Sequence, residues 1–318
     1  MNKLITIGEF LIDFTANGVG ELKTINSFTK NPGGAPANVA ITNQRLGGQS
    51  LFITKLGTDP FGKFLFDILK QEGLNLSHVF QTNDYQTSLA FVALKEDGNR
   101  DFTFYRTQAS DLNIQPDEID EDIFKPHDIF HFCSVDLVES PTKHAHDQAI
   151  KYAKKHDVLI SFDPNLRFPL WPSGEQLRET VLAYLPHADI LKISDDELAF
   201  LSGTKKELAA VRKLFSEQTK LILITKGSKG VTLYSRDGQV ISLPSVAKSV
   251  VDTTGAGDAF IGAFLNQLLK NGITRETLLE RNTDLASYLA FANQVAAKVC
   301  EKYGAIPSIP RLKDVTND

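Results

Sequence analysis

The stretch from Val251 to Phe260, VDTTGAGDAF, has the residue types needed to hold an anion and to activate a hydroxyl group. Gly255, Ala256 and Gly257 carry little or no side chain, so backbone N–H groups at a helix N-terminus here could approach a phosphate closely. Asp258 follows directly and would accept the proton of a hydroxyl. A carboxylate beside phosphate is repelled unless magnesium or the helix end offsets its charge, so the placement favours catalysis over binding alone. Helix capping would explain one residue here but not the whole stretch.

A second stretch, NPGGAPANVA from Asn31 to Ala40, has its own chemistry. The pair Gly33 and Gly34 allows the backbone to bend or to approach a ligand, and Asn38 offers both a donor and an acceptor to sugar hydroxyls. The two stretches, about 220 residues apart, resemble the two signatures of the ribokinase-like, or PfkB, carbohydrate kinases. This resemblance implies an ATP-dependent sugar kinase in which Asp258 is the general base and the amides of 255–257 stabilise the transferring phosphoryl group.

The substrate assignment depends on further phrases that resemble the fructokinase branch of this family. They are Phe104-Tyr105-Arg106 and Phe162-Asp163-Pro164-Asn165-Leu166-Arg167, the second followed by Leu170-Trp171. A guanidinium group can bind several sugar oxygens or the leaving phosphate, although each arginine alone is nearly as well explained by a structural role. The resemblance makes D-fructose the expected sugar, with binding residues Asp13, Gly33, Gly34, Asn38, Phe104, Arg106 and Arg167.

Two alternatives stay open at this point. A 2-keto-3-deoxygluconate kinase would use Arg106 or Arg167 for the carboxylate of its acidic sugar. A sugar-binding regulator without activity could be built on the same fold, but it should tolerate loss of Asp258 or of the glycines beside it, and all of these are present.

The chain lacks the G-x-x-x-x-G-K-[ST] phosphate loop, so nucleotide binding is expected from residues that match the family. Ser194-Asp195-Asp196-Glu197 has serine where the family pattern N-x-x-E has asparagine, which puts the role of Ser194 in doubt but keeps Glu197 as the residue acting on Mg²⁺ through water. A helix N-terminus capped by Ser194 fits the same residues. The remaining nucleotide-binding candidates by resemblance are Lys226, Gly227, Gly230 and Asn293.

The resemblance also implies a monovalent cation site near the second signature. In many family members a C-terminal segment like Gly304-Ala305-Ile306-Pro307-Ser308 holds potassium together with residues at the positions of Asp252 and Thr254. Potassium activation is therefore predicted, with Asp252, Thr254, Gly304 and Ser308 as the residues around the ion.

These residues must be positioned by a scaffold, and the sequence predicts a doubly wound, mostly parallel α/β sheet covered by helices. Short apolar runs alternate with amphipathic segments, as expected when helices cover both faces of a parallel sheet. The candidate ligands fall at carboxyl ends of strands, where such sheets bind ligands. The predicted strands are Leu4–Ile7, Leu51–Lys55, Asp128–Cys133, Val158–Phe162, Asp189–Ile193 and Leu221–Thr225; the predicted helices include Phe61–Glu72, Thr142–His156, Glu175–Leu185 and Leu285–Tyr303.

One part of the chain departs from this alternation. Ser88–Leu94 and Asp101–Arg106 flank the turn residues 96–99, which predicts a β-hairpin without a covering helix. With residues 14–28 it would form a small sheet that acts as a lid over the sugar, inserted in a single ribokinase-like domain of residues 1–318. The apolar face of this lid could also form a homodimer contact. A second hairpin, at Val231–Leu243, is assigned to the nucleotide side.

The amino-acid composition limits the classes of binding partner that this chain is expected to have. The 34 Lys and Arg against 39 Asp and Glu give a net charge of −5 without a basic block, which argues against nucleic acid. No run of 18 apolar residues predicts a membrane span, and the first apolar run is too short for a signal peptide. Cys133 and Cys300 are expected to be reduced, so we expect a cytoplasmic enzyme whose ligands are a sugar and ATP.

Overall fold

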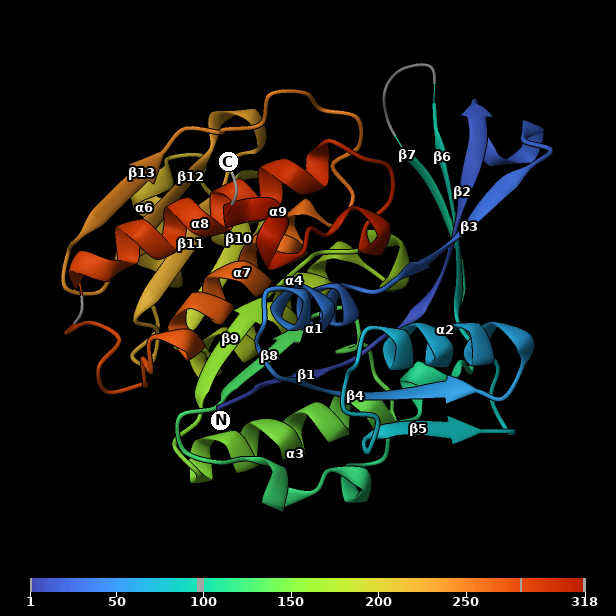
Figure 1. Ribbon diagram of the computed structural model, residues 1–318, viewed down its shortest axis with the longest axis horizontal. Helices are drawn as coiled ribbons and strands as arrows, with labels where there is room; N and C mark the ends of the chain where they lie inside the picture. The colour runs from blue at the N-terminus through green and yellow to red at the C-terminus, as the bar shows by residue number, and fades with distance from the viewer. Residues whose placement is uncertain (1, 96–99, 281, 317–318) are drawn as a thin grey trace.

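The computed structural model describes residues 2–95, 100–280 and 282–316. Its main sheet has nine strands in the order β13-β12-β11-β10-β9-β8-β1-β4-β5 (Figure 1). All neighbours from β11 to β5 run parallel, whereas β12 and β13 form an antiparallel hairpin at one edge. The bounds are β1 Leu4–Ile7, β4 Ser50–Gly57, β5 Val79–Thr82, β8 Ile129–Cys133, β9 Leu159–Asp163, β10 Ile190–Ser194, β11 Leu221–Thr225, β12 Val231–Ser235 and β13 Val240–Leu243.

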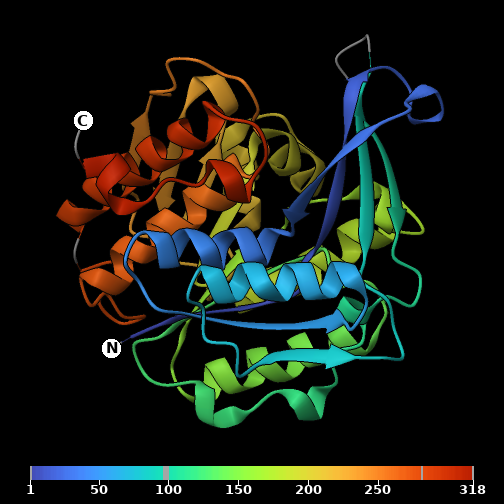
Figure 2. The ribbon, with the colours of Figure 1, turned by 45° about the vertical axis from the view of Figure 1, so that its right-hand side comes forward.

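Helices cover both faces of this sheet, so the predicted doubly wound architecture is confirmed. One apolar cluster joins the sheet to α1, α2, α7 and α8, and a second cluster joins its other face to α3, α4, α5 and α6 (Figure 2). The six predicted strands are present within one or two residues of their expected ends. The helices are α1 Ala35–Arg45, α2 Pro60–Gln71, α3 Pro141–Lys155, α4 Gly174–Tyr184, α5 Asp195–Ser202, α6 Glu207–Leu214, α7 Ala256–Lys270, α8 Asn282–Cys300 and α9 Leu312–Thr316.

Helices α1 and α7 pack unusually closely, and a glycine permits it. A Cβ atom added to Gly262 would lie 2.9 Å from Thr42 Cβ and 3.0 Å from Val39 O, so a larger residue would push the two helices apart. One turn earlier on the same two faces lie Asn38 and Asp258. The glycine therefore brings together residues from the two sequence signatures.

A small sheet projects from the main sheet, with strand order β3-β2-β6-β7 (Figure 1). Its strands are β2 Leu11–Val19, β3 Phe28–Gly33, β6 Leu89–Leu94 and β7 Arg100–Tyr105. Strands β6 and β7 form the predicted antiparallel pair, although the predicted turn at 96–99 lies outside the described residues. Stacked rings on this sheet include Phe14 against Phe91, with centroids 4.9 Å apart. Its action as a lid stays a prediction.

Two other expectations concern the chain as a whole. Among the residues that the structure describes, no helix is both long and apolar enough to cross a membrane. Cys133, at the end of β8, and Cys300, at the end of α8, are both free thiols.

Candidate functional site

Asp258 lies in the first turn of α7 and is held by two neutral amides. Asn38 Nδ2 donates to Asp258 Oδ2 at 2.8 Å, and Asn165 Nδ2 donates to Asp258 Oδ1 at 3.0 Å. The side chain is buried, with 8% of the residue exposed. Because both partners are neutral, they fix the orientation of the carboxylate without neutralising its charge. The two amides thus fix the orientation of the Asp258 carboxylate, and its action as a general base stays a prediction.

The glycine turn before Asp258 has a backbone that other residues would not adopt easily. Gly255 has φ +77°, and an added Cβ would lie 2.6 Å from the Cβ of Ala305. Gly255 is the N-cap of α7 and supplies no side-chain acceptor, so the positive end of this helix is open to an external anion. Ala256 N–H already donates to Thr253 O at 3.2 Å, which leaves the amides of Gly255 and Gly257 as the better anion donors.

A buried ion pair that the sequence reasoning did not single out lies below this turn. Lys192 Nζ in β10 donates to Asp163 Oδ2 at the end of β9, at 2.8 Å. Burial alone would lower the pKa of Lys192, but the carboxylates of Asp163, Glu197 and Asp258 outweigh it and raise that pKa, so the lysine is charged. The available signal was a lysine inside the apolar strand ILKIS, and an internal charge in such a strand requires a partner.

Glu197 is the N3 residue of α5, where it forms a capping box with Ser194. Ser194 N–H and its Oγ–H both donate to Glu197 Oε2, at 2.9 and 2.8 Å. The other oxygen, Oε1, accepts the N–H of Leu166 at 2.7 Å. Burial raises the pKa of Glu197, but Lys192 and these backbone donors lower it overall, so the side chain is an anion. An ionised carboxylate suits a hydrated Mg²⁺, and the capping role predicted as an alternative exists beside it.

The residues predicted to bind the sugar approach Asp258 from the small sheet. Asp13 in β2 is partly buried, and its carboxylate occupies the space where a side chain on Gly33 would lie: an added Cβ would be 1.9 Å from Asp13 Oδ2. Burial raises the pKa of Asp13 to about 7, and the nearby Asp258 also raises it, whereas Arg167 lowers it. Asp258 and Arg167 are therefore each close enough to act on Asp13.

Gly34 joins the small sheet to α1. It has φ +129°, and an added Cβ would lie 2.4 Å from Glu9 O. Only glycine fits this close backbone approach, which places Asn38 one turn into α1. Phe104 in β7 lies on the same face of the small sheet as Asp13, because Asp13 pairs with Ala90 and Ala90 pairs with Phe104. Four other predicted sugar-binding residues thus lie on the same side of the small sheet and its junction with α1 as Asp13: Gly33, Gly34, Asn38 and Phe104.

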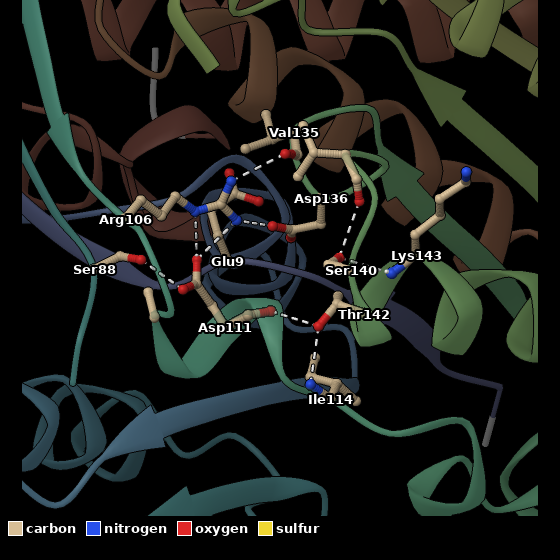
Figure 3. A network of polar contacts seen from close by, with 12 residues as sticks. Glu9, Ser88, Arg106, Asp111, Ile114, Val135, Asp136, Ser140, Thr142 and Lys143 are labelled. Atoms are coloured by element: carbon tan, nitrogen blue, oxygen red, sulfur yellow. Dashed lines mark hydrogen bonds and ion pairs between the residues drawn. The ribbon is translucent and has the colours of Figure 1, made fainter. Parts of the chain in front are cut away.

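The guanidinium group of Arg106 forms hydrogen bonds and ion pairs with other residues of this chain, as Figure 3 shows. It donates from Nε to Asp111 Oδ2 at 2.9 Å and from Nη1 to Val135 O at 3.0 Å, and its Nη2 pairs with Asp136. Only 5% of the residue is exposed. Ser88, at the start of β6, donates to the same Asp111 at 2.5 Å. Ser88 precedes β6 and Arg106 follows β7, so one carboxylate ties the two strands together at the same end of the pair. Arg106 therefore has little freedom to bind a sugar directly.

One of the predicted nucleotide-binding residues, Lys226, lines a cavity of about 560 Å³. Lys226 donates from Nζ to Glu207 Oε1 at 2.7 Å and to Thr232 Oγ1 at 2.8 Å. Pro244 also lines the cavity, and its carbonyl accepts the amide of Asn293 at 2.7 Å. The glycine turn of α7 is not part of its lining.

Glycines shape the loop beside this cavity. Gly230 has φ +93°, and an added Cβ would lie 2.0 Å from Leu243 O, so the close contact between this loop and the end of β13 requires glycine. Gly227 has φ +53° with open space beside it. The predicted nucleotide-binding residues of this region therefore lie around the same loop and cavity: Lys226, Gly227, Gly230 and Asn293.

The residues predicted to surround potassium are joined through one carboxylate. Asp252 Oδ1 accepts both the N–H and the hydroxyl of Thr254, at 3.0 and 2.7 Å, and its Oδ2 accepts Gly304 N–H at 2.9 Å. Ser308 Oγ donates to Tyr303 O at 2.9 Å, next to Gly304. The carboxylate, hydroxyls and turn carbonyls form an oxygen-rich donor set, which fits a hard cation.

Comparison with known proteins gives consistent matches over the whole chain. The pfkB family carbohydrate kinase model matches residues 1–312. A probable fructokinase-5 of Arabidopsis thaliana is 43% identical over 315 residues, covering 98% of this chain and 95% of that protein. A fructokinase of Xylella fastidiosa, solved with bound ATP, superimposes with a TM-score of 0.90 at 33% identity, covering 99% of this chain and 97% of the other.

A fructokinase of Vibrio cholerae O395 extends this comparison to a sugar-bound structure. It was solved in a form with fructose, ADP and calcium ion bound, and it superimposes with a TM-score of 0.87 at 30% identity, covering 100% of this chain and 98% of the other. A double mutant of the same enzyme was solved with fructose, ADP and potassium ion bound.

Proposed function

The chain belongs to the pfkB family of carbohydrate kinases, and from this membership we propose that it is an ATP-dependent fructokinase. It would transfer the γ-phosphoryl group of ATP to the primary hydroxyl of D-fructose, giving fructose 6-phosphate and ADP. The observation that carries the proposal is the arrangement around Asp258: an oriented carboxylate next to a glycine turn at a helix N-terminus, with Asp13 close by.

In this proposal the sugar lies between the small sheet and α1. Asp13 accepts hydrogen bonds from sugar hydroxyls, Asn38 and the backbone of Gly33 and Gly34 complete the pocket, and Phe104 covers it. Arg167, which acts on Asp13 in the structure, contributes positive charge to the same pocket. The hydroxyl to be phosphorylated then points at Asp258.

Catalysis would consist mostly of positioning and charge stabilisation. Asp258 takes the proton of the attacking hydroxyl as the bond to phosphorus forms. The N–H groups of Gly255 and Gly257, with a smaller contribution from Ala256, stabilise the phosphoryl oxygens at the positive end of α7. Mg²⁺, held through water by Glu197 with Ser194 beside it, would supply neutralising charge to the ATP phosphates.

ATP would bind along the loop that holds Lys226, Gly227 and Gly230, with Asn293 on the facing helix. The fructokinase neighbour solved with bound ATP supports ATP as the cosubstrate. Potassium would bind at Asp252, Thr254, Gly304 and Ser308, close to the glycine turn whose amides hold the phosphoryl group. The potassium-bound neighbour and the oxygen-rich surroundings of Asp252 support binding of a cation here.

The geometry makes an acidic sugar less suitable. A 2-keto-3-deoxygluconate kinase needs a guanidinium for the substrate carboxylate, and Arg106 is occupied by Asp111 and Asp136. Arg167 alone would remain for that task. A regulator without activity is disfavoured because the base and both glycines beside it are present and oriented.

We further propose a cytoplasmic enzyme that dimerises through the small sheet. Tyr105 leaves apolar surface on this sheet, with 64% of the residue exposed. Light scattering coupled to gel filtration would test the dimer, with Tyr105→Ser as the variant expected to weaken it.

The experiment that tests the function is ADP release with Mg-ATP and a panel of acceptors. D-fructose should be turned over well above D-ribose, 2-keto-3-deoxygluconate and adenosine, and potassium should increase the rate. If the keto acid were the better substrate, the family and the Asp258 mechanism would stand while the sugar assignment would be wrong. No turnover of any sugar would favour the regulator.

A further inference from the structure

Lys192 is a buried lysine that lies directly beneath the glycine turn of α7. Only 6% of the residue is exposed, and its Nζ pairs with Asp163 at 2.8 Å. A Cβ atom added to Gly257 would lie 3.0 Å from this Nζ, so the ammonium group is packed against the backbone that precedes Asp258. A charge this deep in a parallel sheet costs free energy unless groups of opposite charge are paired with it.

A chain of contacts leads from Lys192 to Asp258. Asp163 binds Lys192 through one oxygen, and through the other it accepts the N–H of Asn165 at 3.1 Å. The side chain of Asn165 then donates to Asp258 at 3.0 Å. Asn165 has φ +44°, an uncommon left-handed conformation, so its contacts must hold it in place.

The same segment is fixed a second time at its next residue. Leu166 N–H donates to Glu197 at 2.7 Å, and the charge of Glu197 acts on Lys192. Loss of the lysine would leave Asp163 and Glu197 as buried anions without their cation, on both sides of Asn165. The conformation of Asn165, and with it the orientation of Asp258, depends on the ammonium group.

From this geometry we propose that Lys192 is a positioning residue, which keeps Asp258 oriented by holding Asp163 and Asn165 beneath the glycine turn. The proposal deepens the proposed function, since it takes Asp258 as the general base. Lys192 acts through its neighbours, and no contact with sugar or phosphate is required of it.

The charges around Asp258 support this role. Asp258 interacts electrostatically with titratable groups on four strands. They are Asp13 in β2, Cys133 in β8, Asp163 in β9 and Lys192 in β10. Arg167 lies near Asp13, and Glu197 of α5 faces Lys192. The acids in this set gather negative charge around Asp258, and Lys192 offsets part of it.

Two substitutions should move the pH profile in opposite directions. Lys192→Met removes the positive charge beneath the glycine turn, so the acid limb of the kcat profile moves up by about one pH unit. Asp163→Asn removes a negative charge, so the same limb moves down. General damage to the site would not give shifts of opposite sign. The KM for the sugar should change little in either variant.

The chain offers a matched control in Lys55 of β4. Lys55 is 8% exposed, and its Nζ pairs with the partly exposed Glu118 at 2.5 Å, so Lys55→Met makes the same replacement of a buried lysine in another ion pair. This control should lose stability to a similar degree and keep the wild-type pH profile. Lys192→Arg retains the charge and should keep the acid limb near its wild-type position.

Profiles are measured with whichever sugar the wild type phosphorylates, so an error in the sugar assignment does not affect the result. If the wild type phosphorylates the sugar but no variant shifts the acid limb of the kcat profile, the Lys192 proposal alone is contradicted. If the wild type phosphorylates no sugar, the proposed function is contradicted. Shifts of the same sign in Lys192→Met and Asp163→Asn would also overturn the proposal. If Lys192→Met does not fold, Asp163→Asn decides, and a limb that is unshifted or moves upward refutes it.

Discussion

Two buried charge clusters in this protein have the same composition and different behaviour. The catalytic cluster contains Lys192 with Asp163, Glu197 and Asp258, and the Arg106 cluster contains Arg106 with Asp111, Asp136 and Glu9. Each therefore has one cation and three carboxylates.

The clusters differ in what the cation binds. The planar guanidinium of Arg106 reaches two carboxylates and a carbonyl at once, so the cluster is closed. Lys192 pairs with Asp163 and leaves Asp258 to neutral amides at a helix N-terminus. The arrangement of partners, and not the number of charges, therefore determines whether a carboxylate is available to accept a proton.

The third carboxylate of each cluster shows the same contrast. Glu9 accepts Ala35 N–H through Oε1, and within the described residues its Oε2 is buried without a hydrogen-bond partner. Burial raises the pKa of Glu9 to about 7, even though Arg106 lowers it. Glu9 is thus enclosed behind the α1 N-terminus, whereas Asp258 faces the turn that would hold phosphate.

Breaking the Arg106 cluster should have the largest effect on stability. Arg106→Gln leaves Asp111 and Asp136 buried without their cation, which should cost about 3–5 kcal/mol of unfolding free energy. Urea unfolding measures this, with Arg178→Gln as control because Arg178 donates to the Leu201 carbonyl and not to a carboxylate. If Arg106→Gln kept its stability and lost a hundredfold in kcat, the guanidinium would act on the substrate and the contrast between the clusters would fail.

Removing one amide from the catalytic cluster should give an intermediate effect on rate. Asn165→Gly deletes the donor to Asp258 while tolerating the left-handed backbone, so it isolates the hydrogen bond. A hydrogen bond to a charged group contributes about 1.5–3 kcal/mol, which corresponds to a fall in kcat of roughly ten- to a hundredfold. Steady-state kinetics would measure it.

The control for this variant lies in the same helix as Asp258. Asn266 of α7 donates its amide to Asn43 instead of to the catalytic cluster, at 2.9 Å. Asn266→Ala should reduce stability and leave kcat within a factor of about two, since its hydrogen bond is remote from the carboxylate. Equal losses of kcat in Asn165→Gly and Asn266→Ala would mean that packing of α7, and not the amide, controls the rate.

The smallest predicted effect concerns pH and sugar binding. Burial raises the pKa of Asp13 to about 7, so the side chain is protonated below that pH and becomes an anion above it. Since the carboxylate accepts the sugar hydroxyls, fructose affinity should strengthen as pH rises from 6 to 8, by up to about tenfold. Calorimetric titration without ATP would show this, and Asp13→Asn should bind weakly at every pH. An affinity independent of pH in the wild type would place Asp13 outside the sugar site.

Much of the fold could be predicted from the sequence because the strands of the main sheet are apolar runs buried on both faces. Leu4–Ile7 and Leu221–Thr225 match β1 and β11 at both ends, and the other four predicted strands differ by one or two residues at an end. The last helix, predicted at Leu285–Tyr303, begins and ends three residues earlier, at Asn282 and Cys300.

The site was predictable where one segment carries several functional residues, as in the turn before Asp258. The contacts that orient Asp258 were not, because Asn165 is 93 residues away from it in the chain and Lys192 lies in another strand. Arg106 shows the opposite difficulty: an arginine at a strand end looks the same whether it binds a sugar or carboxylates from distant loops. Only the folded chain shows that Asp136, 30 residues away, is its partner.

The central claim is that Asp258 performs the proton transfer within an intact scaffold, and Asp258→Ala tests it most directly. We expect kcat with Mg-ATP and fructose to fall by about 10²–10⁴, the usual contribution of a positioned general base, while the dissociation constant for fructose and the urea midpoint stay close to those of the wild type. A variant that folds, binds fructose and retains near-normal kcat would contradict the account.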